Sequence, residues 1–229
     1  MLKYKMKLML LLAVLTLSTQ SIAGVIFSSA DDILGGYSDG SQFLVGDECF
    51  NSTENCWPGG EDPTNIIDGF GQKYLNFIGD ESPSGVIITA SIGSTIADSI
   101  KLWTANDAES RDPASFELYG TNIDLTGSAF SLNLFDLIAN GPLALPSSRN
   151  NGGAGELLDI NSQTISFSNS NAYSSYLVLF PTVKDADNAN STQIAEIQLF
   201  GEVAQVPEPS TLAIFALSII GFASRKFKK

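Results

Sequence analysis

The chain has 229 residues, of which 25 are acidic, 12 are basic and none is histidine, so its formal net charge is −13. A protein this acidic would repel the phosphates of DNA and RNA, which argues against nucleic-acid binding. The lack of histidine removes the usual general base near neutral pH, so we do not expect an enzyme.

The first 23 residues have the three parts of a secretory signal peptide. Three lysines lie within the first seven residues, residues 8–17 form an apolar run, and small residues precede Gly24. This order of charged, apolar and small-residue segments is typical of a signal that a signal peptidase removes. We therefore expect residues 1–23 to form a signal helix that is cleaved during export.

The central part of the chain, residues 24–203, is expected to form one domain. It carries 24 acidic and five basic side chains, a net charge of −19. This charge favours either simple solubility outside the cell or attraction of divalent cations, and the sequence leaves both interpretations open. The five basic residues are Lys73, Lys101, Arg111, Arg149 and Lys184.

The two cysteines, Cys49 and Cys56, enclose a polar loop of six residues. In an exported chain, two cysteines this close are expected to form a disulfide that closes the loop. A metal site would need more soft ligands than this chain offers.

Short β-rich runs separated by turn residues fill the central domain. In the run 85–92, for example, Val86 and Ile88 point to one face and Ile87 to the other. Eight or nine such runs with long polar connections predict an all-β fold, an antiparallel jelly-roll sandwich. A helical turn or two is expected at 135–139. The clearer runs are residues 25–28, 73–78, 85–92, 99–104, 115–121, 164–167, 175–181 and 193–203. The pattern is mixed at 37–45 and weaker at 130–134 and 157–160.

Three segments carry a family resemblance. They are Ile66–Gly69, the stretch 100–122 with its Asp-Pro-Ala-Ser-Phe-Glu-Leu-Tyr-Gly run, and Ile194–Gly201. Together they resemble the discoidin, or F5/8 type C, domain over residues 65–201. The resemblance implies the galactose-binding-like jelly roll, which many carbohydrate-binding modules share.

The resemblance also implies a structural calcium ion held by Asp68 and Glu196, with backbone carbonyls completing the six to eight oxygen ligands. The sequence departs from the family after Gly69, where Phe70 and Gln72 replace the usual polar residues. The alternative is that Asp68 only caps a turn and Glu196 is a solvated strand residue.

Sugar sites in this fold combine an aromatic platform with polar loop residues. Trp57 and Tyr37 are the candidates for the platform, and Arg149 and Asn150 are the candidates for the polar contacts. We expect an extracellular polysaccharide as the ligand.

The C-terminus begins with a Pro-Glu-Pro motif, continues with an apolar segment at 212–223, and ends in a basic tail at 224–229. This order resembles the PEP-CTERM sorting signal of Gram-negative bacteria, here residues 204–229. The resemblance implies cleavage by an exosortase after an intermediate held in the inner membrane by the sorting helix, and then release to the cell surface or matrix. A plain membrane anchor is the alternative, although 12 residues are few for a span of roughly 20. The motif consists of Val206, Pro207, Glu208, Pro209, Ser210 and Thr211.

These features predict an exported, non-catalytic protein that binds carbohydrate at the cell surface or in an exopolysaccharide matrix. The first alternative is a structural biofilm-matrix protein with the same fold and no specific sugar site. The second is an accessory hydrolase, because glycoside hydrolysis needs only two carboxylates.

Overall fold

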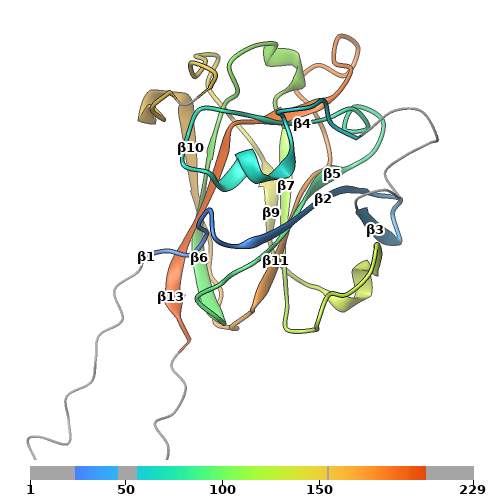
Figure 1. Cartoon of the computed structure of the whole chain (residues 1–229), viewed down its shortest axis with the longest axis vertical. Coiled ribbons are helices and arrows are strands. Elements are labelled where there is room, and N and C mark those ends of the chain that lie inside the picture. The colour runs from blue at the N-terminus through green and yellow to red at the C-terminus, as the bar shows by residue number, and fades with distance from the viewer. Residues whose placement is uncertain (1–23, 46–55, 154, 205–229) are drawn as a thin grey trace, which may run out of the picture.

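Strands dominate the computed structural model, which describes residues 24–45, 56–153 and 155–204 (Figure 1). They form two large antiparallel sheets and one small one, so the predicted all-β sandwich is confirmed. The predicted signal helix, Cys49 and the predicted sorting helix lie outside the described residues. Within the described ranges, no helix is long and apolar enough to cross a membrane.

The first large sheet has four strands in the order β1-β13-β6-β10. Ile100 and Leu102 of β6 lie opposite Leu199 and Ile197 of β13, so their side chains share the inner face. The bounds are β1 Gly24–Val25, β13 Glu196–Val203, β6 Thr95–Trp103 and β10 Ser162–Ser166.

The second large sheet has seven strands in the order β8-β3-β2-β5-β11-β7-β9. A two-stranded sheet of β12 (Thr192–Ile194) and β4 (Tyr74–Asn76) lies beside the sandwich. The seven strands are β8 Ala129–Ser131, β3 Gln42–Val45, β2 Asp32–Ser38, β5 Ser84–Thr89, β11 Ser175–Phe180, β7 Ser115–Thr121 and β9 Asp136–Pro142. The 3-10 helices are η2 Pro63–Ile67, η3 Glu109–Arg111, η4 Leu132–Leu134 and η5 Asp159–Asn161.

The seven-stranded sheet must curl strongly. Its two edge strands, β8 and β9, are joined through η4 by only four residues, 132–135. Five Cα steps reach at most about 18 Å, whereas the edges of a flat seven-stranded sheet would lie about 29 Å apart. The curl encloses a second hydrophobic cluster, which includes Phe43, Ile87, Phe130 and Leu177.

The main core lies between the two large sheets. Val86 and Ile88 of β5 and Val178 of β11 contribute to it, together with Ile100 and Leu199 from the facing sheet. Ile87 points the other way, as the alternation predicts, but it is buried in the second cluster. The seven-stranded sheet is therefore apolar on both faces around its centre, and a polar site can form only near the ends or edges of its strands.

The structure corrects several predicted elements. Residues 135–139 are not helical, because 136–142 form strand β9, which pairs with β7. The strand predicted at 157–160 is absent from that segment, where η5 begins at Asp159. The predicted strand 193–203 is interrupted at Ala195, because β12 pairs with β4 while β13 pairs with β6.

The molecule has two distinct ends. We call the end that contains Gly24 and Ala204 the terminal end; β2 and β11 begin there and β5 finishes there. We call the opposite end, where β7 begins and β6 and β11 finish, the loop end. In Figure 1, β1 and β13 lie at the left side of the sandwich.

Candidate functional site

At the loop end, the turn after η2 brings Asp68 and Glu196 together. Gly69 adopts a φ of 82°, a conformation that favours glycine, and its N–H donates to Glu196 Oε2 at 3.1 Å. Asp68 Oδ1 accepts from the N–H of Phe70 at 2.7 Å, so Asp68 does cap a turn. Glu196, the first residue of β13, is only 2 % exposed, so the prediction of a solvated strand residue is wrong.

The electrostatics of this pair favour the uncharged forms. Burial raises the pKa of Glu196 to about 8, and repulsion from Asp68 adds to the shift. Burial also raises the pKa of Asp68, with a further contribution from Asp62. Each carboxylate would be stabilised by a nearby cation.

The donor set fits calcium in its chemistry. Two hard carboxylate groups lie at one turn, and backbone carbonyls would have to supply the remaining oxygens. No group of three or more acidic or cysteine side chains suited to a metal occurs in the part of the chain that the structure describes. The calcium role of Asp68 and Glu196 therefore stays a prediction.

The predicted aromatic platform lies along β2. The ring of Trp57 is partly buried and meets Tyr74 edge-on, with 6.0 Å between ring centroids. It also approaches Gly35 so closely that a Cβ there would lie 3.1 Å from the indole. Tyr37 follows Gly35 by two positions on the same strand, so it points to the same face. The structure therefore places both aromatic residues on one side of β2.

The two predicted polar contacts are engaged inside the protein. Arg149 makes a two-pronged ion pair with Asp112, with both N–O distances 2.7 Å, and Asp112 is fully buried. Asn150 is 3 % exposed, donates to the carbonyl of Thr104 at 2.7 Å, and accepts from Asn161 at 2.9 Å. Their ligand-binding role stays a prediction, but these bonds hold the 145–151 loop on the sandwich.

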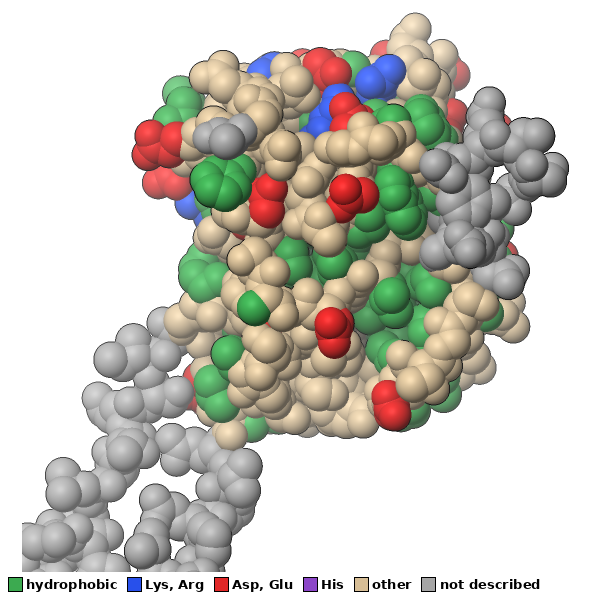
Figure 2. Space-filling model, in the orientation of Figure 1, with side chains coloured by type: hydrophobic (Ala, Val, Ile, Leu, Met, Phe, Trp, Pro, Cys, Tyr) green, Lys and Arg blue, Asp and Glu red, His purple; other side chains and the backbone are tan. Residues whose placement is uncertain are grey.

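All five basic side chains of the domain gather at the loop end. Lys73 contacts Asp107 at 2.8 Å, and Lys101 contacts Asp159 at 2.6 Å. Lys184 joins the buried pair, at 3.1 Å from Asp112. Arg149 belongs to that pair, and Arg111 closes η3 at the same end. In Figure 2 the basic side chains lie over the upper part of the visible face, while acidic ones also occur over its lower part.

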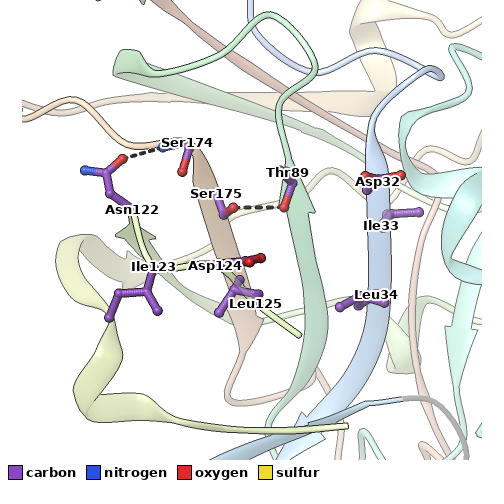
Figure 3. Close-up of a pocket in the computed structure, with 10 residues that line it drawn as sticks. All are labelled: Asp32, Ile33, Leu34, Thr89, Asn122, Ile123, Asp124, Leu125, Ser174 and Ser175. Carbon is purple, nitrogen blue, oxygen red and sulfur yellow. Dashed lines mark hydrogen bonds between the residues drawn. The ribbon is translucent and has the colours of Figure 1, made fainter. Parts of the chain in front are cut away.

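Sequence reasoning missed a cavity at the terminal end, with a volume of about 580 Å³. It lies on the face of the seven-stranded sheet that points away from the main core, where the loop after β7 crosses the sheet (Figure 3). No aromatic residue of the described segments lines it, and its parts come from four separate stretches of the chain, so no local motif marks it. Its lining is formed by Asp32, Ile33, Leu34, Thr89, Asn122, Ile123, Asp124, Leu125, Ser174 and Ser175.

Hydrogen bonds order the polar side of this cavity. Thr89 Oγ1 and Ser175 Oγ lie 2.8 Å apart across β5 and β11. Asn122 donates to the carbonyl of Ala172 at 2.8 Å and accepts from the N–H of Ser174 at 2.9 Å, which fixes the start of the crossing loop. Aliphatic side chains line the rest, so the cavity offers both polar and apolar surface.

The disulfide prediction remains a prediction. Cys56 is buried, with 1 % of its surface exposed, whereas Cys49 lies outside the described residues.

Comparison with known proteins confirms the predicted sorting signal. Residues 205–229 match the family model of the PEP-CTERM protein-sorting motif. This motif indicates export and surface sorting through an exosortase in Gram-negative bacteria. No curated protein matches the chain.

Solved structures with a similar fold include several carbohydrate-binding modules. The family 32 module of Clostridium perfringens NanJ, solved with galactose, is 12% identical and has a TM-score of 0.49, over 78% of this chain and 99% of that one. The family 32 module of Streptococcus pneumoniae EndoD is 10% identical, with a TM-score of 0.48 over 78% and 100% of the two chains. A fucose-binding module of Streptococcus pneumoniae is 14% identical, with a TM-score of 0.45 over 81% and 100%.

Proposed function

We propose that this protein binds carbohydrate without catalysis, at the cell surface or in an extracellular polysaccharide matrix. The cavity at the terminal end carries the proposal. Its volume of about 580 Å³ lies within the range of about 300–1,000 Å³ that small-molecule sites occupy. Carboxylate and hydroxyl groups beside aliphatic side chains suit a sugar, which presents hydroxyls at its edges and C–H groups on its faces.

Export and sorting bring the domain to such a ligand. A signal peptidase removes residues 1–23, the apolar segment 212–223 holds an intermediate in the inner membrane, and an exosortase cleaves near residues 206–211. The mature domain then reaches the surface or the matrix.

Calcium has a structural role in the proposal. Asp68 and Glu196 hold the ion, which neutralises their charges and ties the turn after η2 to the start of β13. The ion lies at the loop end and the cavity at the terminal end, so calcium stabilises the fold without touching the sugar.

Glycan-array binding of the full chain in mild detergent tests the proposal. We expect the wild-type protein to bind a glycan. Thr89→Tyr fills the cavity and should weaken this binding. Tyr37→Ala and Trp57→Ala, at the predicted platform, should leave it unchanged. Thermal melts must show that each variant is folded. If Trp57→Ala is folded but no longer binds, and Thr89→Tyr binds normally, the sugar site is at the predicted platform and not in the cavity. Release of reducing sugar from a bound glycan would contradict the non-catalytic part.

A structural matrix protein is the second candidate. It is favoured by the loop end, where Arg149, Lys73 and Lys184 form ion pairs with protein carboxylates. No binding to any glycan, with the protein still located in the matrix, would establish this candidate over the first.

A further inference from the structure

The charged groups that line the terminal-end cavity are two carboxylates, those of Asp32 and Asp124. The hydroxyls of Thr89 and Ser175 pair with each other, and the side chain of Asn122 is bonded at both of its polar atoms. The carboxylates of Asp32 and Asp124 have neither a hydrogen bond nor an ion pair with any described residue. An ionised carboxylate only accepts hydrogen bonds, so this cavity favours a ligand that is rich in donors.

The basic side chains of the domain all lie at the loop end, which strengthens the preference of the cavity for a donor-rich, cationic ligand. The described part of the terminal end carries no basic side chain, because all five lie at the loop end. The negative electrostatic potential at the terminal end therefore attracts cations and repels anions. The acidic side chains at the terminal end are Asp31, Asp32, Asp98, Asp124, Asp136 and Glu202.

The two free carboxylates reach the cavity from different elements. Asp32 begins β2, and Asp124 lies on the loop that follows β7 (Figure 3). The lining also includes aliphatic side chains, of which Leu34 and Leu125 are half-buried and Ile123 is 47 % exposed. A bare metal ion would need six to eight oxygen ligands and would gain nothing from this apolar surface. A sugar ring that bears an ammonium group uses both the apolar surface and the charge.

We infer that this cavity selects saccharides that carry a protonated primary amine, such as deacetylated hexosamine units. The inference rests on the proposed carbohydrate binding and names its substrate class. The ammonium group supplies three donors and a positive charge to the carboxylates of Asp32 and Asp124. Uronic acids and other anionic sugars are excluded by the same charges. N-acetylated sugars, which have one amide N–H and no charge, bind more weakly.

Calorimetric titration of the full chain in detergent tests this selection. The probes are the disaccharide of glucosamine, the disaccharide of N-acetylglucosamine and a glucuronate disaccharide. We expect the amine to bind about tenfold more tightly than the N-acetyl form, and the glucuronate not to bind. Raising the salt from 0.05 to 0.5 M should reduce the amine preference, because exposed charges are screened.

Variants that keep the shape of the side chain but remove its charge test whether Asp32 and Asp124 cause the preference for the amine. Asp32→Asn and Asp124→Asn should each weaken amine binding by up to about fivefold and weaken binding of the N-acetyl form less, so that the preference for the amine falls. Glu202→Gln is the matched control, because it removes one charge from the same end, outside the cavity, and should keep the preference.

The outcomes separate the two proposals. Equal affinity for the amine and the N-acetyl form would overturn the inference while sugar binding stands. If Glu202→Gln reduces the preference for the amine as much as Asp32→Asn does, the inference is overturned too. The overall negative charge of the terminal end, and not the cavity, would then cause the preference. No binding of any saccharide would overturn the proposed function as well.

Discussion

Replacing Glu196 by glutamine should remove a pH dependence that the calcium-free wild-type protein shows. The folded-state pKa of Glu196 is raised from the ordinary 4.5 to about 8. Below pH 4.5 the carboxyl is protonated in both states and imposes no penalty. Between pH 4.5 and 8 the unfolded chain releases a proton that the folded protein keeps, so the free energy of unfolding falls as pH rises.

The size of the effect follows from the shift. One pKa unit corresponds to about 1.4 kcal/mol, so the full penalty above pH 8 is about 5 kcal/mol. Between pH 5.5 and 8.5 the penalty grows by about 3 kcal/mol, because part of it is already present at pH 5.5. For a chain of this size, each kcal/mol moves Tm by about 2–4 °C, which gives a fall of about 6–12 °C over that range. Glu196→Gln keeps the shape of the side chain and has no charge to bury, so we expect its Tm in EDTA to change far less over the same range.

Thermal melts of the full chain at pH 5.5 and 8.5, in EDTA and in calcium, measure this directly. Calcium binds the ionised carboxylate, so it should raise the wild-type Tm more at pH 8.5 than at pH 5.5. Glu202→Gln, on the exposed end of the same strand, is the control and should behave like wild type.

The fluorescence of Trp103 gives a second measurement of calcium binding. It pairs across the strands with Glu196, and the chain contains only one other tryptophan, Trp57. The calcium-induced fluorescence change should persist in Trp57→Phe and vanish in Trp103→Phe. An equal fall in Tm for wild type and Glu196→Gln between pH 5.5 and 8.5 in EDTA would refute the proposed burial of a titrating Glu196.

Three further predictions follow from the packing and the sorting signal. Arg149→Met leaves the fully buried Asp112 with a weaker set of partners, so we expect a loss of about 3–5 kcal/mol in chemical denaturation. Gly85→Ala would place a Cβ 1.9 Å from a backbone oxygen of β11 and should lower Tm sharply, whereas Gly141→Ala meets its nearest atom at 4.0 Å and should be tolerated. Alanine at residues 207–209 should block exosortase cleavage, so cell fractionation should find an uncleaved, membrane-bound precursor.

Each of these predictions has a control or a contradicting result. Lys101→Met breaks an ion pair whose partner, Asp159, is 89% exposed, and it should cost less than about 1 kcal/mol. Equal losses for Lys101→Met and Arg149→Met would show that burial of the Asp112 pair is unimportant. Similar Tm values for the two glycine variants would contradict the strand packing. Normal processing of the alanine variant would show that the motif is not what the exosortase reads.

Local patterns predicted the strands well where the side chains alternate. β7 has the predicted bounds because its residues alternate, and β11 nearly has them because it is a short apolar run that is buried at every position. β9 was missed because Phe135, Ile138 and Ala139 have helical spacing. Pairing with β7 at the sheet edge overrides that spacing.

The site residues were harder to predict because their partners are distant in sequence. Asp112 and Arg149 are 37 positions apart, and Gly69 and Glu196 are 127 apart. The cavity depends on the curl of the seven-stranded sheet and on a loop that crosses it, and neither leaves a local motif.

An NMR titration of the isotope-labelled full chain with an oligosaccharide tests the central claim most directly. We expect amide shifts to concentrate at residues 32–34, 122–125 and 174–175, which line the cavity. Shifts confined to the loop end, around Trp57 and Arg149, or no shifts with any sugar, would contradict it.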